Sequence, residues 1–395
     1  MIDLMDRISK SKGPDRSRPK PGDTRLRRES PFRPTRACGA SPRFGQPAFG
    51  RLRHPLSERT NGWTVTPGQY LVLAYAALAA LTLIVLTGAA VRLTSSGLGC
   101  PHWPQCDGKL YPPLSTHALI EFSNRLLTGP VAIAAGLAWV GALRRRPYRR
   151  DLARLSALLA LGVVAQAVLG GLTVRGKLAY GWVMGHFALS MLILVAAATL
   201  VWRASQNWDA RQRGVSTGFG QEPDACPGEA GRALVHAARA LVGLGALTIF
   251  AGTAATAAGP HAGGNPGERI NRLDFDGKGT LDFVIHRHAE IAFAFGLLAL
   301  AVWWLARRRG ADRQVRRATT ALCVLLALQG AVGIDQYETH LPTELVWVHV
   351  ALACGCWLAA LWTVCAVGPL RAPLTEPREP PRERREAPPP VRISA

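Results

Sequence analysis

The sequence predicts an all-α integral membrane protein with eight transmembrane helices arranged as two pseudo-repeated four-helix bundles. Its 395 residues are 48% hydrophobic yet carry a formal net charge of +21. Apolar and basic residues are therefore segregated, and apolar stretches near the length of a membrane-spanning helix alternate with arginine-rich connections. A glutamine, glycine and histidine recur with one spacing, which indicates a duplicated unit. The two copies are Gln166, Gly170 and His186, and then Gln329, Gly333 and His349.

Hydropathy marks eight spans along the chain. The third and seventh are short for a full crossing of a bilayer, which takes about 20 residues. The predicted spans cover residues 70–91, 120–143, 155–174, 182–202, 234–258, 283–306, 318–334 and 345–367.

Arginines concentrate in alternate connections, and the positive-inside rule places these connections in the cytoplasm together with both termini. We therefore expect a multi-pass protein of a cell membrane, of the bacterial inner-membrane type, with the lipid bilayer as its surroundings. No nucleic-acid partner is expected, because the arginines flank spans and the N-terminal segment has no interleaved aromatic residues. The basic connections are the N-terminal segment, residues 144–150, 203–232 and 307–317, and the tail after residue 371.

Composition divides the chain into five parts. The two ends are rich in arginine and proline and poor in large apolar residues, so we expect them to be disordered. The parts are a basic cytoplasmic arm (1–63), an N-terminal four-helix half (64–203), a cytoplasmic linker (204–232), a C-terminal four-helix half (233–368) and a cytoplasmic tail (369–395).

The connection after the first span contains two cysteines in a proline-rich segment, Cys100 and Cys106. This connection faces the oxidising side in the predicted topology, which favours a disulfide. The alternatives are a metal site that includes His102 and two unrelated thiols. Cysteines inside the spans are most simply small apolar packing residues.

The second span begins with a polar group of residues: His117, Glu121 and Asn124 fall on one face of a helix. A carboxylate at the mouth of a membrane helix is costly unless it faces protein or water, so Glu121 is a candidate functional residue. The alternative is an interfacial ion pair between Glu121 and Arg125, four residues further along.

The sixth span begins in a similar way, with His286, Arg287, His288 and Glu290. Aligning the halves on their glycines places Asn124 opposite His288, whereas aligning them on the following arginine places it opposite His286. One of these two histidines, together with His349, could supply both axial ligands of a haem iron in a helical bundle. The alternative for each is a histidine hydrogen-bonded to a neighbouring helix.

In combination, three features of the chain resemble the heme A synthase family over residues 64–368. The first is the loop Gly97-Leu-Gly-Cys100-Pro-His-Trp-Pro-Gln-Cys106. The second is the segment Glu121-Phe-Ser-Asn124-Arg125 at the beginning of the second span. The third is the repeated pattern that ends in a histidine, on a chain of eight spans.

The resemblance implies an integral membrane enzyme that oxidises the C8 methyl group of heme O to the formyl group of heme A by successive hydroxylations. It implies substrate haem in the N-terminal half and low-spin haem b in the C-terminal half. Heme O synthase and an electron-transfer protein are the expected partners. The implied roles are Glu121 as catalytic carboxylate, His186 as substrate-iron ligand, Cys100 and Cys106 as a redox or structural pair, and His349 with His288, or else His286, as haem b ligands.

The chain departs from the family pattern at Asn124, where a second histidine is usual and an amide is a poor iron ligand. Either His186 alone binds the substrate iron or His117 approaches it from about one and a half to two helical turns above Asn124. A non-enzymatic di-haem cytochrome b remains an alternative, although it would not need Glu121. A transporter is disfavoured, because its polar groups would lie nearer the bilayer midplane.

Overall fold

The computed structural model describes residues 63–100, 102–103, 105–106, 111–212, 229–264, 270–275 and 279–368. Nearly all of the predicted arm, the middle of the predicted linker and the whole predicted tail lie outside these residues. The described residues form eight α-helices and no strand. The helices are α1 (Pro67–Leu93), α2 (Thr116–Arg144), α3 (Arg150–Arg175), α4 (Tyr180–Gln212), α5 (Glu229–Ala258), α6 (Thr280–Arg308), α7 (Arg313–Glu338) and α8 (Thr343–Val367).

By length and composition, each of these eight helices is able to cross a membrane. The prediction of an all-α membrane protein with eight spans is therefore confirmed. Both α3 and α7 have 26 residues and extend beyond the short apolar stretches 155–174 and 318–334. Their first turns carry arginines, which hydropathy excludes from a span although the helical backbone continues through them.

Local sequence signals explain where several helices begin. Thr66 and Gln69 form a reciprocal capping box around α1, and Pro67 takes the first helical position. The Ser115 side chain accepts a hydrogen bond from the Ala118 amide at the start of α2. Asp312 caps α7 in a similar way, with its carboxylate 2.6 Å from the Arg313 amide nitrogen.

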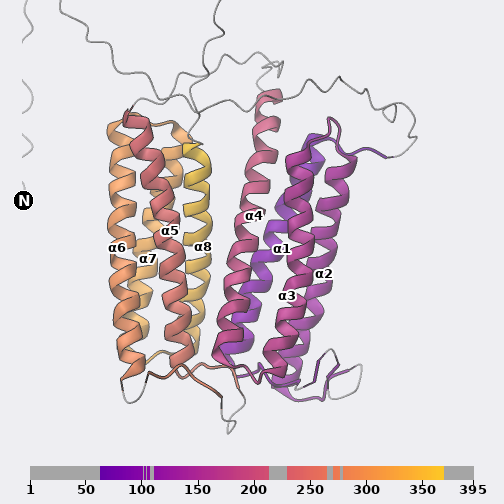
Figure 1. Ribbon diagram of the computed structural model, residues 1–395, viewed down its shortest axis with the longest axis vertical. Coiled ribbons are helices and arrows are strands. Elements are labelled where there is room, and N and C mark those ends of the chain that lie inside the picture. The colour runs from indigo at the N-terminus through magenta and orange to yellow at the C-terminus, as the bar shows by residue number, and fades with distance from the viewer. Residues whose placement is uncertain are drawn as a thin grey trace, which may run out of the picture. The chain divides into compact units, whose positions relative to one another are not determined.

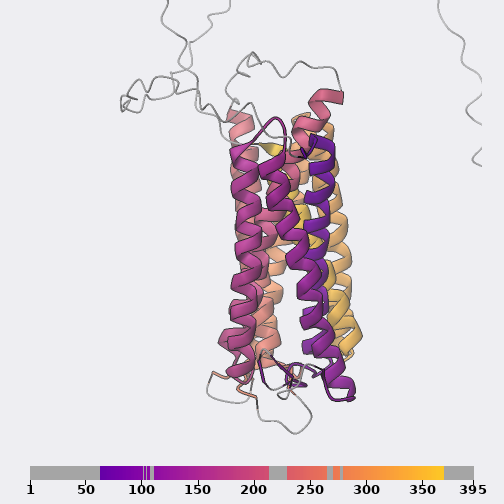
Figure 2. The same ribbon diagram turned by 90° about the vertical axis from the view of Figure 1, so that its right-hand side faces the viewer.

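The helices form two four-helix groups, α1–α4 and α5–α8 (Figure 1). Within each group every helix packs on the next one along the chain, and the first helix also packs on the last. This arrangement is consistent with the predicted duplication. After a turn of 90°, Figure 2 shows α1–α4 in front of α5–α8. All eight helices belong to one compact unit.

Helix α8 joins the two groups. Its buried residues Trp357 and Leu361 belong to the core of α1–α4, whereas Ala360 belongs to the core of α5–α7. Two of its tryptophans donate hydrogen bonds across the junction. The Trp357 indole reaches the Met191 carbonyl on α4 at 3.2 Å, and the Trp347 indole reaches the Leu86 carbonyl on α1 at 3.1 Å.

The connections that follow α1 and α5 also meet. The Gly97 amide donates to the Gly263 carbonyl at 2.9 Å, and the Arg92 guanidinium donates to the Thr256 carbonyl at 3.2 Å. A Cβ atom at Gly97 would lie 2.9 Å from the same Gly263 carbonyl oxygen, so the close approach requires glycine there. These contacts place the cysteine-containing loop of the N-terminal half beside the C-terminal half.

Candidate functional site

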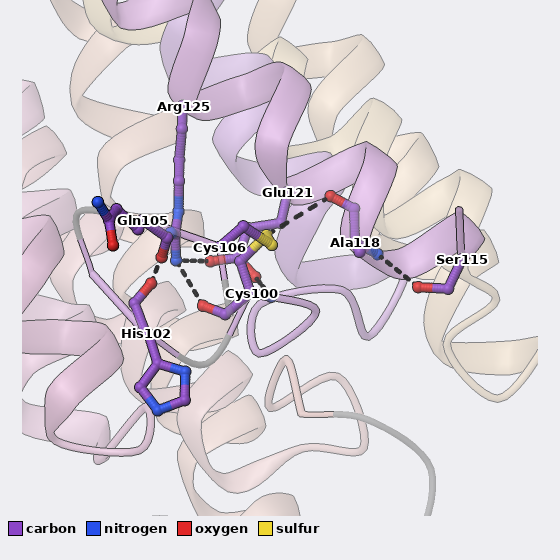
Figure 3. The surroundings of a disulfide bond; sticks show 8 residues. All are labelled: Cys100, His102, Gln105, Cys106, Ser115, Ala118, Glu121 and Arg125. Carbon is purple, nitrogen blue, oxygen red and sulfur yellow. Dashed lines mark hydrogen bonds and ion pairs between the residues drawn. A yellow bond between two sulfur atoms is a disulfide. The ribbon is translucent and has the colours of Figure 1, made fainter. Parts of the chain in front are cut away.

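A disulfide joins Cys100 and Cys106 in the loop after α1 (Figure 3). The prediction from the loop composition is therefore confirmed. Both cysteines are buried, and they pack with Ala118 in the first turn of α2. The Cys100 sulfur also lies 3.8 Å from the Ala118 carbonyl oxygen. The disulfide thus fixes the loop against the end of α2 from which the predicted carboxylate projects.

Glu121 lies directly beneath this loop and is only 5% exposed. One of its carboxylate oxygens accepts a hydrogen bond from the Cys100 amide at 2.7 Å, and the other lies 2.5 Å from the Arg125 guanidinium. The ion pair considered at the sequence level is thus present. Glu121 is buried beneath the loop and Arg125 is half-buried, and the carboxylate also accepts a hydrogen bond from the backbone of a disulfide cysteine, so the pair is more than a solvated interfacial pair.

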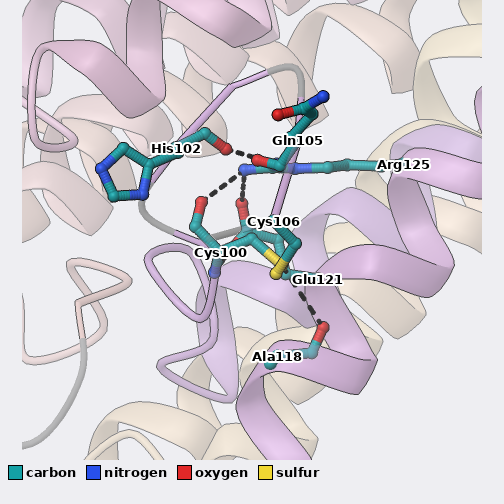
Figure 4. Close-up of polar contacts among 7 residues, drawn as sticks. All are labelled: Cys100, His102, Gln105, Cys106, Ala118, Glu121 and Arg125. Atoms are coloured by element: carbon teal, nitrogen blue, oxygen red, sulfur yellow. Dashed lines mark hydrogen bonds and ion pairs between the residues drawn. A yellow bond between two sulfur atoms is a disulfide. The ribbon is translucent and has the colours of Figure 1, made fainter. Parts of the chain in front are cut away.

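Arg125 binds the loop through its backbone (Figure 4). Its guanidinium donates to the carbonyls of Cys100 at 2.7 Å, His102 at 2.9 Å and Gln105 at 3.5 Å. A planar guanidinium has five donors in a fixed fork, which suits several carbonyls at once. Sequence reasoning treated Arg125 only as a partner for Glu121, because spacing along a helix cannot reveal contacts with a separate loop.

Trp103 packs the same loop against a second helix, α3. A Cβ atom at Gly171 on α3 would lie 2.8 Å from the Trp103 ring, closer than packed carbon atoms approach. Gly171 is buried, so the indole packs directly on the α3 backbone. The disulfide loop is therefore held by α2 through Arg125 and by α3 through Trp103.

His117 is directed toward the loop. Its Nδ1 lies 3.0 Å from the Ser96 hydroxyl, just after the end of α1. A Cβ atom at Gly99 would lie 2.5 Å from the His117 carbonyl oxygen, so the loop backbone also packs against this residue. His117 thus contributes to the packing of the loop on α2, whereas Asn124 makes its contacts with α1.

Asn124 accepts a hydrogen bond from the Thr87 hydroxyl on α1 at 2.7 Å. Its amide nitrogen is also the nearest group to a Cβ atom built at Gly88, at 3.9 Å. In the other half, a Cβ atom at Gly252 on α5 would lie 3.0 Å from the His288 ring. Asn124 and His288 thus face corresponding glycines, in agreement with the alignment that pairs Gly88 with Gly252.

The repeated glycine and histidine also meet in both halves. A Cβ atom at Gly170 would lie 3.3 Å from the His186 ring, and one at Gly333 would lie 3.1 Å from the His349 ring. Each glycine therefore lets an imidazole lie against the neighbouring helix. The Nδ1 atoms of His186 and His349 are buried and have no hydrogen-bond partner among the residues that the structure describes.

Gln166, the glutamine of the repeated pattern in the N-terminal half, forms hydrogen bonds with the helix that carries His186. The Gln166 amide donates to the His186 carbonyl at 3.1 Å and also to the Ser190 hydroxyl. Ser190 in turn donates to the His186 carbonyl at 3.1 Å. These contacts, which the sequence pattern did not reveal, join α3 to α4 next to the imidazole.

His288 and His349 face each other within the C-terminal half, and their ring centroids are 6.2 Å apart. The Nδ1 atom of His288 donates to the Thr248 carbonyl at 3.0 Å, which leaves its Nε2 lone pair available to a metal. His286 is exposed instead, and its Nδ1 donates to the Asp282 carbonyl of its own helix at 2.7 Å.

This pair of histidines fits a haem iron. Imidazole nitrogens bind a transition metal at about 2 Å, so the separation of the two rings is compatible with one metal atom between them. Two imidazoles supply both axial ligands, and a porphyrin supplies the remaining four nitrogens. In the N-terminal half, His186 is the one histidine in the corresponding frame and Asn124 stands where His288 stands in the other half.

The chain is also similar in sequence to known proteins. The sequence model of the cytochrome oxidase assembly protein family (COX15-CtaA) matches residues 71–119 and 114–361. A heme A synthase of Lysinibacillus sphaericus is 35% identical over 148 residues, which make up 35% of this chain and 46% of that protein. A heme A synthase of Bacillus cereus is 31% identical over 136 residues, or 33% of this chain and 44% of that protein.

A longer match is found with a protoheme IX farnesyltransferase of Thermus thermophilus. The identity is 29% over 293 residues, which make up 70% of this chain and 45% of that protein. The chain thus spans about half the length of the curated relatives that it matches. From the extent of the family match, together with the eight membrane helices and the disulfide loop, the chain belongs to the heme A synthase family of cytochrome oxidase assembly proteins.

Proposed function

We propose that the protein is a heme A synthase that oxidises the C8 methyl group of heme O to a formyl group. This proposal rests on one observation: two corresponding positions carry two histidines in the C-terminal half but one histidine and one asparagine in the N-terminal half. His288 and His349 face each other in one half, whereas Asn124 and His186 occupy these places in the other. One half is thus suited to retain a haem and the other to exchange one.

The C-terminal half is the proposed site of haem b, with His288 and His349 as axial ligands. Haem in such a site supplies one-electron transfer. The Thr248 carbonyl fixes the tautomer of His288, and Gly252 and Gly333 leave room for the two imidazoles beside the neighbouring helices. Bis-histidine ligation leaves no open position on the iron, which suits an electron-transfer group.

The N-terminal half is the proposed site of heme O, the substrate. His186 binds its iron, and the Asn124 amide, which is held by Thr87, lies where a second ligand would be expected. A single axial ligand allows the substrate to enter and the product to leave. Each hydroxylation replaces one C–H bond of the methyl carbon by a C–OH bond; with water as the source of the oxygen atom, two protons are released and two electrons pass to the redox partner. The geminal diol formed by the second hydroxylation loses water to give the formyl group.

Glu121 is the proposed catalytic carboxylate. It lies at the mouth of α2, one helical turn before Asn124 and in contact with the disulfide loop. A buried carboxylate at this point can accept a proton released during oxidation of the methyl group. Arg125 holds one of its oxygens in place, so the same pair that fixes the loop also orients the proton acceptor.

The proposed location is a cell membrane of the bacterial inner-membrane type, with both termini in the cytoplasm, because arginine-rich connections alternate along the chain. Heme O synthase is a fitting partner, since it would deliver a hydrophobic substrate directly. A redox protein is needed as well, because each hydroxylation changes the oxidation state of the methyl carbon by two electrons.

The decisive experiment supplies heme O to the purified protein and analyses extracted haems by chromatography and mass spectrometry. Formation of heme A, through the singly hydroxylated intermediate, is the expected result. A pyridine hemochrome spectrum measured in parallel reports the resident haem b. A protein with intact low-spin haem b but no conversion of heme O would instead be an electron-transfer cytochrome b.

A further inference from the structure

The turn between α6 and α7 contains a pocket of about 640 Å³. Four guanidinium groups and one hydroxyl line it, and no carboxylate does. The lining residues are Arg307, Arg313, Arg316, Arg317, Thr320 and Ala321. A concentration of positive charge in a concave site favours an anion, and arginines bind phosphate oxygens in a bidentate manner.

One wall of the pocket is fixed by aromatic and hydroxyl contacts. The Arg307 guanidinium lies 4.4 Å from the centroid of the Trp303 ring, and it donates to the Thr320 hydroxyl at 3.2 Å. The Trp303 indole donates to the same hydroxyl at 3.1 Å. The other three arginines of the lining come from α7, and no acidic residue lines the pocket with them.

The first half provides a direct comparison. In the frame that pairs Gln166 with Gln329, Asp151 corresponds to Gln314. Asp151 forms ion pairs with Arg149 and Arg203, so arginines at that turn are neutralised. At the α6–α7 turn the residue in the place of Asp151 is the uncharged Gln314. The acidic residue of this turn is Asp312, which does not line the pocket and whose carboxylate accepts a hydrogen bond from the Arg313 amide at 2.6 Å.

The surroundings of the pocket are those of a membrane boundary. Trp304 lies beneath Arg308, with the guanidinium 4.7 Å from its ring centroid, and tryptophans of this kind mark the interface between lipid and water. Further along the same helices, Leu300 on α6 and Val324 on α7 are more than half exposed. An anion in the pocket would therefore lie directly above an apolar surface suited to acyl chains.

We infer that this pocket binds the phosphate group of an anionic phospholipid, with the guanidiniums around the headgroup and the acyl chains along α6 and α7. Basic pockets between membrane helices on the cytoplasmic side are suited to such headgroups. The site is separate from the haem ligands, which lie toward the opposite ends of α6 and α8.

Native mass spectrometry of the purified full-length protein tests the inference with dioctanoyl phosphatidylglycerol as the probe and dioctanoyl phosphatidylcholine as the zwitterionic reference. We expect the anionic lipid to bind more tightly. The double variant Arg313→Gln and Arg317→Gln should weaken its binding by about tenfold or more, because basic residues near the membrane surface each strengthen the binding of anionic lipids. Binding of phosphatidylcholine should not change.

The matched control is Arg150→Gln with Arg154→Gln, which removes the same charge at the corresponding positions of α3. This variant should bind phosphatidylglycerol as the wild type does. An equal loss in both double variants would show a general charge effect and overturn the inference. So would displacement of the lipid by millimolar inorganic phosphate, which would indicate a site for soluble anions. Monodispersity in size-exclusion chromatography verifies that each variant is folded.

Discussion

The imidazole rings of His288 and His349 lie 6.2 Å apart between their centroids, with an interplanar angle of 72°. They come from α6 and α8, which are separated in sequence by α7. Of the polar residues at the mouth of α6, His288 is therefore the one that the structure brings to His349. His286, two positions earlier, points away because two residues rotate a helix by more than half a turn.

The first prediction distinguishes these neighbouring histidines. His288→Ala should abolish the low-spin haem b spectrum of the purified protein, since one of its two axial ligands is removed. His286→Ala should leave the spectrum unchanged, because its ring is bonded to its own helix. Optical and electron paramagnetic resonance spectra measure both outcomes. The reverse pattern would assign the ligand to His286.

The second prediction concerns the unequal halves. His349→Ala should remove the resident haem b and lower the yield of folded protein, because a buried cofactor site would be left incomplete. His186→Ala should retain that haem but abolish formation of heme A. Haem content and conversion of heme O are measured on the same preparations. Loss of the resident haem from His186→Ala alone would reverse the assignment of the halves.

The third prediction uses the corresponding positions Asn124 and His288. A Cβ atom at Gly88 meets no group closer than 3.9 Å, so an imidazole can lie in place of the Asn124 amide. Asn124→His should therefore supply a second ligand to heme O bound in the N-terminal half. We expect that haem to become low-spin and turnover to fall. Asn124→Gln, which retains an amide, is the control and should not change the spin state.

The fourth prediction separates chemistry from loop structure at Glu121. Glu121→Gln retains a hydrogen-bond acceptor for the Cys100 amide but removes the charge, so we expect formation of heme A to fall by about a hundredfold or more. Heme O should still bind. Arg125→Lys keeps the charge but cannot contact three carbonyls as a planar fork does. It should make the disulfide easier to reduce, measured by thiol labelling at increasing reductant concentrations.

Comparison of these two variants decides the role of Glu121. If Glu121→Gln retains wild-type turnover, the carboxylate serves the ion pair and the loop rather than the reaction. Arg125→Lys could also lower turnover as strongly as Glu121→Gln does while its disulfide resists reductant as well as that of the wild type. In that case Arg125 affects turnover by a route other than the structure of the loop.

The fifth prediction concerns the disulfide itself. Alkylation before reduction should label neither Cys100 nor Cys106, whereas alkylation after reduction should label both, as measured by mass spectrometry. Replacing both cysteines by alanine should lower the free energy of unfolding by about 2 kcal/mol, the value expected for a short closed loop. Haem b should remain bound, since the loop belongs to the other half. Loss of haem b would contradict this separation.

The fold was largely predictable because a membrane-spanning helix requires a long run of apolar residues, which is easily recognised in a sequence. Long apolar stretches and arginine-rich turns predicted all eight helices, and the cysteines in a proline-rich loop favoured the disulfide over a metal site or two separate thiols. The ends of α3 and α7 were less predictable, since Arg150 and Arg313 belong to helices although their charges lower the local hydropathy.

Contacts of the site were less accessible to sequence reasoning. Residues on one helix face follow from helical periodicity, which is why His117, Glu121 and Asn124 could be placed on one face of α2 from the sequence. Contacts between distant segments do not follow from it. Arg125 with the loop carbonyls, Trp103 on Gly171 and Thr87 with Asn124 all depend on how separate elements pack.

The position of α8 has a consequence for biosynthesis. A chain is made from its N-terminus, so α1–α4 enter the bilayer well before α8 leaves the ribosome. Yet α8 supplies Trp357 to the core of that first group and donates the Trp347 hydrogen bond to α1. The N-terminal half therefore lacks its contacts with α8 until this last helix is inserted. Completion of both halves then coincides with arrival of His349, so neither half matures long before the other.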